Sequence, residues 1–161
     1  MNFAKENRMK RSAVVSTVLL LAACVGVTIN AAMGDTEKSE AQAVERAVLD
    51  YCEAFYEVKP EYVERSVHRN VDKFGFWRQG DSTGYHRIPM NYEQLHELAK
   101  VWNAKGDQVN ANTPKKVEVF DVLDKTASAK LTAQWGIDYM LLVKYEGKWM
   151  IERVVWQSHP K

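Results

Sequence analysis

Asp138 and Tyr139 are the neighbouring pair in this sequence best suited to acid–base chemistry. A carboxylate in an apolar pocket has a raised pKa and can act as a general base, and a tyrosine hydroxyl can donate a proton. Neighbouring residues of a strand, however, point to opposite faces of a sheet. Both can therefore face one pocket only if Gly136 introduces a bulge before them. The alternative is an aspartate at the sheet edge beside a packed tyrosine.

His68 is the other candidate base, because an imidazole exchanges a proton near neutral pH. It follows a predicted short helix, so its ring could instead bond the last carbonyl groups of that helix. The histidines form no i,i+4 pair, and Cys52 is the only cysteine after Cys24. The sequence thus predicts no protein-built metal site, no cofactor and no disulfide within the mature chain.

Large aromatic side chains are spread over several predicted elements. Rings from separate elements can wall an apolar cavity that holds a small molecule, although the same rings could simply fill a core. Trp77, followed by Arg78 and Gln79, is the ring most expected to be partly exposed. The predicted ligand-binding residues are Phe55, His68, Phe76, Trp77, Tyr92, Trp102 and Trp135.

Helices come first among the elements that must position these residues. Apolar residues at helical spacing predict a helix over about 40–57, with Ser39 and Gln42 as its capping box. Pro60 is suited to the first turn of a short second helix. Asn91 can cap a third helix, whose apolar face ends with Trp102.

Strands dominate the remainder. Residues 70–77 form the first predicted strand, and Gly80 to Pro89 is predicted to be a loop because of its turn residues. The later strands cover 115–122, 127–135, 137–145 and 149–157, and Gly136 interrupts the third strand as a bulge or bend. The predicted class is α+β, with the helices packed on one face of a curved, mostly antiparallel sheet.

The last two strands are apolar in both parities. A sheet solvated on one face alternates apolar with polar residues, which 137–145 and 149–157 do not do. Because helices can cover only one face, the other is expected to meet a second copy of the chain. The sequence therefore predicts a homodimer through the convex face of the sheet.

Residues 1–32 are typical of a targeting signal, since four basic side chains precede an uncharged apolar run over 13–23. Cleavage is expected before Cys24, which ends a lipobox-like Leu-Ala-Ala-Cys, or near Ala31 and Ala32. The third alternative is an uncleaved anchor. Each places the domain outside the cytoplasm, periplasmic or secreted, with membrane contact only through this segment or a lipid on Cys24.

Domain organisation and charge follow from this division. A polar leader over 33–39 separates the signal from one domain over 40–157. The formal net charge of the whole chain is +1, and four of its basic side chains lie in the predicted signal. Such a balance argues against an electrostatic nucleic-acid binder.

Three strings, together with Tyr51 near the end of the first predicted helix, carry a resemblance to a known family. The strings are Ser-Val-His-Arg-Asn over 66–70, Thr-Ala-Ser-Ala-Lys-Leu over 126–131 and Asp-Tyr-Met-Leu-Leu-Val-Lys-Tyr-Glu-Gly-Lys-Trp-Met-Ile over 138–151. With the order of elements, they resemble the putative lumazine-binding branch of the nuclear transport factor 2-like superfamily, over about residues 40–157. Where that family often has a proline after the histidine, this chain has Arg69.

The resemblance implies a cone-shaped fold and a heterocyclic ligand, with His68 near the mouth of the pocket. The superfamily also contains isomerases, cyclases, dehydratases and assembly domains. We therefore expect an exported, non-catalytic domain that binds a flat or apolar small molecule. The alternatives are a small enzyme with His68 or Asp138 as its base, and a structural dimerisation module with a filled cavity.

Overall fold

The structure is a computed structural model that describes residues 36–80 and 84–160. The chain divides into two units, Met1–Ser39 and Glu40–Lys161, and the second contains every strand described. The predicted signal, with its cleavage sites at Cys24 and at Ala31 or Ala32, lies outside the described residues. Among the helices that are described, none is long and apolar enough to span a membrane.

Three helices are described. Residues 36–56 are helical, as predicted for 40–57, but Ser39 does not cap this helix because the residues before it are already helical. The second helix, α2 (Glu61–Ser66), follows Pro60 at its N-cap. Asn91 caps α3 (Tyr92–Val101) as predicted: its side chain accepts from the Gln94 N–H, and the Gln94 side chain accepts from the Asn91 N–H, both at 2.9 Å.

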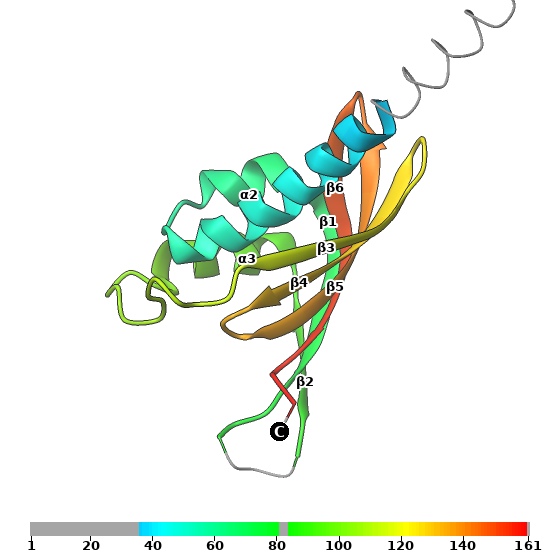
Figure 1. Cartoon of the computed structure of the whole chain (residues 1–161). Coiled ribbons are helices and arrows are strands. Elements are labelled where there is room, and N and C mark those ends of the chain that lie inside the picture. Colours follow the sequence, from blue (N-terminus) through cyan, green and yellow to red (C-terminus); the bar gives the residue numbers. More distant parts are fainter. Residues whose placement is uncertain (1–35, 81–83, 161) are drawn as a thin grey trace, which may run out of the picture. The chain divides into compact units, whose positions relative to one another are not determined.

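Six strands form one sheet in the order β2-β1-β6-β5-β4-β3 (Figure 1). Only the β1–β6 pair is parallel; the other neighbours are antiparallel. The predicted α+β class and mostly antiparallel sheet are therefore confirmed. The strands are β1 (Val67–Trp77), β2 (His86–Met90), β3 (Lys116–Val122), β4 (Thr126–Ala133), β5 (Gly136–Tyr145) and β6 (Lys148–Gln157).

The predicted loop over 80–89 is wrong in its second half, because β2 begins at His86. Pro89 suggested a loop, since proline cannot donate to a ladder of hydrogen bonds. In the structure β2 is an edge strand that pairs only with β1, and Pro89 lies opposite Phe74. An edge strand tolerates proline where its missing N–H would face away from the neighbouring strand.

Gly136 does not introduce a bulge before Asp138. The strand predicted over 127–135 ends at Ala133, and Gln134 and Trp135 form a two-residue turn into β5. Gly136 has φ +147°, and a Cβ there would lie 1.9 Å from the Gln157 carbonyl oxygen, so only glycine fits. Alternation along β5 then buries Asp138 and leaves Tyr139 on the opposite face, 54% exposed.

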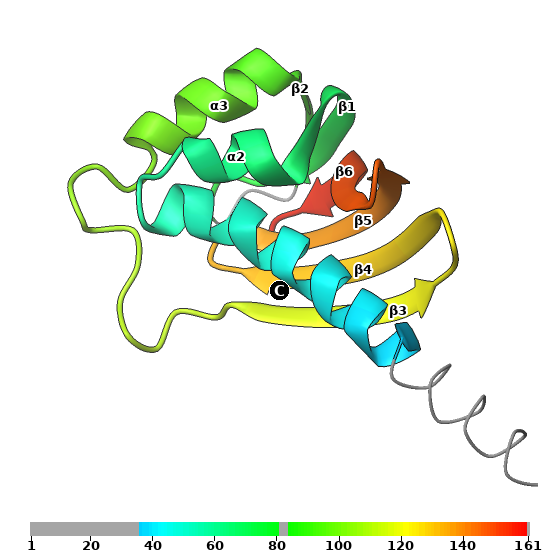
Figure 2. The ribbon, with the colours of Figure 1, turned by 90° about the horizontal axis from the view of Figure 1, so that it is seen from above.

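All three helices lie over the same, concave face of the sheet (Figure 2). The core between them holds the buried apolar residues of helix 40–56, of α3 and of the inward positions of the strands. On β4 these positions are Ala127, Ala129, Leu131 and Ala133, which are the alternate residues that the period of two predicted. The core therefore lies on one side of the sheet only.

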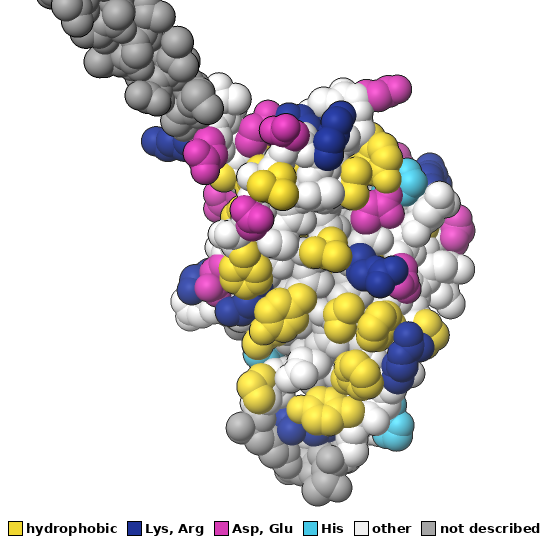
Figure 3. Space-filling view, turned by 90° about the vertical axis from the view of Figure 1, so that its right-hand side faces the viewer, with side chains coloured by type: hydrophobic (Ala, Val, Ile, Leu, Met, Phe, Trp, Pro, Cys, Tyr) yellow, Lys and Arg dark blue, Asp and Glu magenta, His cyan; other side chains and the backbone are white. Residues whose placement is uncertain are grey.

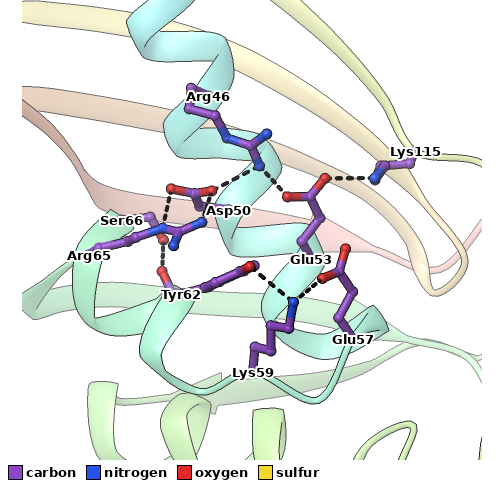
Figure 4. A network of polar contacts seen from close by, with 9 residues as sticks. All are labelled: Arg46, Asp50, Glu53, Glu57, Lys59, Tyr62, Arg65, Ser66 and Lys115. Carbon is purple, nitrogen blue, oxygen red and sulfur yellow. Dashed lines mark hydrogen bonds and ion pairs between the residues drawn. The ribbon is translucent and has the colours of Figure 1, made fainter.

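A network of ion pairs fixes helix 40–56 to its surroundings (Figure 4). The Arg65 guanidinium donates to both oxygens of Asp50 at 2.6 Å and so joins α2 to this helix. Arg46 bridges Asp50 and Glu53, and Lys115, just before β3, donates to Glu53 at 2.6 Å. The bidentate Arg65–Asp50 pair sets the angle between the two helices with more geometric specificity than a single contact would.

The convex face of the sheet carries an apolar patch (Figure 3). One row of paired positions crosses three strands as Phe74, Val155 and Tyr139, and a second row contains Phe76 and Ile137. Tyr139 and Leu141 are more than half exposed, and Phe76 is 39% exposed. Both parities of β5 are therefore apolar in space as well as in sequence.

Candidate functional site

A cavity of about 520 Å³ lies between the helices and the concave face of the sheet. That volume is in the range of pockets that hold small molecules. Half-exposed Trp77 and exposed Gly80 belong to its lining and mark the side that meets solvent. The lining residues are Tyr51, Phe55, Lys73, Trp77, Arg78, Gly80, Met90, Leu95, Leu98, Trp102, Gln134, Trp135, Trp156, Ser158 and His159.

Three rings from three different elements build one wall. Phe55 of helix 40–56, Trp102 at the end of α3 and Trp135 of the β4–β5 turn meet edge to face, with centroids 5.4 to 6.4 Å apart. The Trp102 ring also stacks on Tyr56 at 5.8 Å. Edge-to-face contacts of this kind hold aromatic rings in fixed orientations, so the wall is preformed.

A buried lysine lies among these rings. Lys73 of β1 is only 6% exposed, and its Nζ donates to the Tyr51 hydroxyl at 2.7 Å. The same Nζ lies 3.4 Å from Oδ1 of Asp138, which is fully buried. Lys73 is part of the cavity lining and Asp138 is not, so the ion pair joins a lining residue to a carboxylate buried beyond the lining.

Asp138 is itself held in place by the aromatic wall. The Trp135 Nε1–H donates to Asp138 Oδ2 at 2.7 Å, so each carboxylate oxygen has a donor. Trp135 thus forms part of the wall with its ring and anchors the counter-ion of Lys73 with its N–H. A shift of Trp135 would change both the shape of the cavity and the charge balance at the amine.

Burial shifts the ionisation of this group. Loss of hydration lowers the pKa of Lys73, although the Asp138 carboxylate opposes the shift. Loss of hydration likewise raises the pKa of Asp138 against the opposing effects of Lys73 and Trp135. Burial raises the pKa of Tyr51 well above 10, so this phenol keeps its proton. The fraction of Lys73 in the neutral amine form is consequently larger than that of an exposed lysine.

The cavity is richer in unused donors than in unused acceptors. The buried Arg78 Nε and Trp156 Nε1, both on lining residues, have no hydrogen-bond partner among the described residues. A Lys73 ammonium carries three donors, and its hydrogen bonds within the described chain go to Tyr51 and Asp138. A molecule that offers acceptor oxygens would therefore complement the site.

Four of the seven predicted ligand-binding residues line the cavity: Phe55, Trp77, Trp102 and Trp135. Phe76 does not, because β1 alternates and its ring joins Phe74 on the convex face, with centroids 6.3 Å apart. Tyr92 does not either; as the first residue of α3 it is buried beneath the Arg69 guanidinium, which lies 4.3 Å from the centre of its ring.

His68 is not at the rim of the cavity. Because β1 begins at Val67, which is buried, His68 points to the other side of the strand. Its ring stacks on Tyr145 at 4.6 Å, and its Nδ1 lies 3.0 Å from Glu152. Neither Tyr139, which faces outward, nor His68 is thus placed to act on a molecule in the cavity.

The sequence reasoning missed Lys73 and the Tyr51 hydroxyl, and it left Trp156 out of the predicted ligand-binding residues although this ring lines the cavity. A signal for Lys73 existed, because it shares the parity of Val71, Gly75 and Trp77 in the predicted strand, and a lysine on the inward parity of a buried strand is rare. Within the described residues no three histidine, cysteine, aspartate or glutamate side chains are grouped to hold a metal ion. Burial raises the pKa of the Cys52 thiol to about 12, which suits a packing role.

Comparison with known proteins agrees with this architecture. Residues 39–157 match the model of the family described as "Putative lumazine-binding". No significant match to a curated protein is found. An NTF-2 like protein of unknown function from Silicibacter pomeroyi DSS-3 is similar in structure, with a TM-score of 0.57 and 14% identity over 76% of this chain and 98% of that one.

Two further structures share the fold. An NTF2-like protein of unknown function from Shewanella baltica OS155 has a TM-score of 0.54 and 18% identity, over 76% of this chain and 96% of that one. The "Putative Scytalone Dehydratase" of Novosphingobium aromaticivorans DSM 12444 has a TM-score of 0.50 and 14% identity, over 79% and 89%. The fold is therefore the nuclear transport factor 2-like cone, as the sequence resemblance implied.

Proposed function

We propose that this chain, which belongs to the family described as "Putative lumazine-binding", binds a small flat molecule in its aromatic cavity. The observation that carries the proposal is the position of Lys73, a buried lysine in the lining of a cavity of about 520 Å³ that is walled by aromatic rings. Burying a charged or polar amine in such surroundings destabilises the fold. A binding role explains why a lysine is found there, because its amine can recognise a ligand.

The ligand is expected to be planar and to carry at least one acceptor oxygen. Planarity matches the wall of Phe55, Trp102 and Trp135, against which a flat ring can stack. An acceptor oxygen matches the amine of Lys73 and the unused donors of Arg78 and Trp156. Lumazine, a bicyclic heterocycle with two carbonyl oxygens, has both properties and is the probe that the family description suggests.

The experiment is a titration of the intrinsic tryptophan fluorescence of the full chain with lumazine. Trp102→Ala should weaken binding by about 1–3 kcal/mol, the scale of losing a buried or stacked ring. Phe76→Ala is the matched control, since that ring lies on the convex face and its loss should leave affinity unchanged. Equal losses in both variants, or no binding to the wild type, would count against the proposal.

Binding without turnover is part of the proposal. Both oxygens of Asp138 already accept hydrogen bonds, from Lys73 and Trp135, and the carboxylate is not part of the cavity lining. His68 lies outside the cavity altogether. The alternative is an isomerase, dehydratase or cyclase. The enzyme alternative would be supported if the wild type converts a bound ligand to product and the Asp138→Asn variant still binds that ligand but does not convert it.

Export is proposed from residues 1–32, whose basic start and apolar run are typical of a signal. Intact-mass measurement of the protein from its native host distinguishes the routes. A mature chain that begins at Ala32 or Met33, or at a lipidated Cys24, supports export. Unprocessed protein recovered from the cytoplasm overturns it.

A homodimer through the convex face is proposed from the apolar patch around Tyr139 and Leu141. Exposed apolar patches that span several strands are typical of interaction surfaces. The patch is bordered by both signs of charge, since Arg153 and Asp72 form an ion pair at 3.1 Å beside it. A two-fold pairing of identical surfaces can match such charges with their opposites.

A further inference from the structure

We infer that Lys73 forms an imine with an aldehyde or ketone group of a flat ligand in the cavity. The inference rests on the proposed binding function and adds a covalent step to it. It concerns an amine that is 6% exposed, lies in the cavity lining, and has Tyr51 and Asp138 within hydrogen-bonding reach.

Lys73 has the surroundings that make an amine nucleophilic. An ammonium has no lone pair, so only the neutral amine attacks a carbonyl carbon. Loss of hydration on burial disfavours the charged form of Lys73. The Asp138 carboxylate, 3.4 Å from Nζ, can accept the proton that the ammonium gives up, and the pair then consists of two neutral groups.

Imine formation also needs a proton donor at the carbonyl oxygen, and Tyr51 is placed to supply it. The Tyr51 hydroxyl lies 2.7 Å from Nζ, and the residue belongs to the cavity lining. A carbonyl group whose carbon contacts Nζ would therefore bring its oxygen near this hydroxyl. Burial raises the pKa of Tyr51, so its hydroxyl carries a proton at neutral pH, and a proton from the amine replaces the one that it passes to the oxygen.

The step balances without any further reactant. The amine lone pair forms the C–N bond as the carbonyl π bond breaks, and the oxygen takes a proton from Tyr51. The two protons of the neutral amine then leave the nitrogen one after the other by way of Tyr51, which passes the second proton to the oxygen and ends protonated. Water departs and a C=N bond forms, so nothing is oxidised or reduced and the reaction is reversible.

Other lysines of the sheet and helices lack these surroundings. Lys130 donates to Glu118 at 2.9 Å, and this hydrogen bond raises its pKa. Lys144 pairs with Glu40 at 2.6 Å. Both are paired with a glutamate, and neither belongs to the cavity lining. They serve as internal references for a chemical test of Lys73.

The test is reductive trapping of the full chain with 2-naphthaldehyde and cyanoborohydride at neutral pH, followed by peptide mapping. Lys73 should carry the naphthylmethyl group at least about tenfold more often than Lys130 or Lys144, because the neutral amine is the reacting form. Tyr51→Phe should slow trapping at Lys73 several-fold, whereas Tyr139→Phe, which removes an exposed hydroxyl, should not. Even labelling of all lysines would overturn the inference.

A second arm separates this inference from the binding function. The alcohol 2-naphthylmethanol has the same ring but no carbonyl, and its binding is followed by tryptophan fluorescence. If the alcohol binds and the aldehyde displaces it without preferential labelling of Lys73, the covalent step is wrong and the binding proposal stands. If neither compound enters the cavity, both proposals fail for this ligand class.

Discussion

Lys73 and Asp138 face each other across an intervening strand. Lys73 lies on β1 and Asp138 on β5, with β6 between them, yet Nζ and Oδ1 are 3.4 Å apart. The long lysine side chain reaches over the inward surface of β6 to the short aspartate. Neither residue would be paired within its own hairpin, so the ion pair depends on correct assembly of the whole sheet.

This dependence predicts a non-additive effect on stability. Asp138→Leu should destabilise the domain by about 3–5 kcal/mol, because it leaves an amine buried without its counter-charge. The double variant with Lys73→Met should be more stable than Asp138→Leu alone, since no buried charge is then left unpaired. Urea unfolding of the three variants measures the coupling. A double variant as unstable as the sum of the single changes would show that the pair is not energetically coupled.

Gly75→Ala should distort the cavity at Trp156, which is one of its lining residues. A Cβ at Gly75 would lie 2.1 Å from Trp156 Nε1, so the indole must move. A loss of about 1–3 kcal/mol in unfolding free energy is expected from such overpacking, together with weaker binding of lumazine. Gly84→Ala is the control, because a Cβ there meets no atom within 4 Å. Urea unfolding and the fluorescence titration check both effects, and unchanged binding in Gly75→Ala would separate Trp156 from the site.

Glu53 should contribute to the acid sensitivity of the fold. Its partial burial alone would raise the pKa, but hydrogen bonds from Lys115 and Arg46 outweigh this and lower it below 4.5. A lowered folded-state pKa gives stability that is present above 4.5 and is lost as the pH falls through the folded value. In the Glu53→Gln variant, the melting temperature should therefore fall less steeply than in the wild type as the pH drops below 4.5.

The matched control for this pH effect is Glu45→Gln on the same helix, where the side chain is exposed. Melting temperatures of the wild type and both variants are compared between neutral and acidic pH. If Glu53→Gln keeps the full acid dependence of the wild type, the ion pairs around Glu53 do not stabilise the helix in the way Figure 4 suggests.

The order of elements was predictable because its signals are local. The capping box at Asn91 and the alternation over Ala127 to Ala133 are each written in a few neighbouring residues. The strand β2 was not predictable, because Pro89 is compatible with a strand only at an edge of the sheet. Edge position is a property of the assembled sheet.

The site was only half predictable for a related reason. Phe55, Trp102 and Trp135 were identified by size alone, which suffices for a cavity wall. The strand β1 keeps one parity, with Val67, Val71 and Lys73 on the inward face. His68 therefore points outward, although the family resemblance had implied a place at the mouth of the pocket. The inward positions of β6 change from Trp149 and Ile151 to Val154 and Trp156 at an irregularity that the sequence does not mark.

Leu141→Lys should weaken the proposed dimer. Leu141 is 53% exposed on the convex face and lies opposite Arg153, so a lysine there adds like charge to the patch. Light scattering should give a dimeric mass for the wild type at tens of micromolar and a smaller mass for the variant. Leu123→Lys, at an exposed position in the turn between β3 and β4, should stay dimeric. A monomeric wild type would remove the basis for the dimer.

The central claim is that Lys73 recognises an oxygen of a flat ligand, and a cycle of two proteins and two ligands tests it most directly. Calorimetric titrations of the wild type and Lys73→Met with lumazine and with pteridine, which lacks the two carbonyl oxygens, give four affinities. We expect Lys73→Met to cost lumazine about 1.5–3 kcal/mol, the scale of a hydrogen bond to a charged group, and to leave pteridine nearly unaffected. The same change for both ligands would contradict the account.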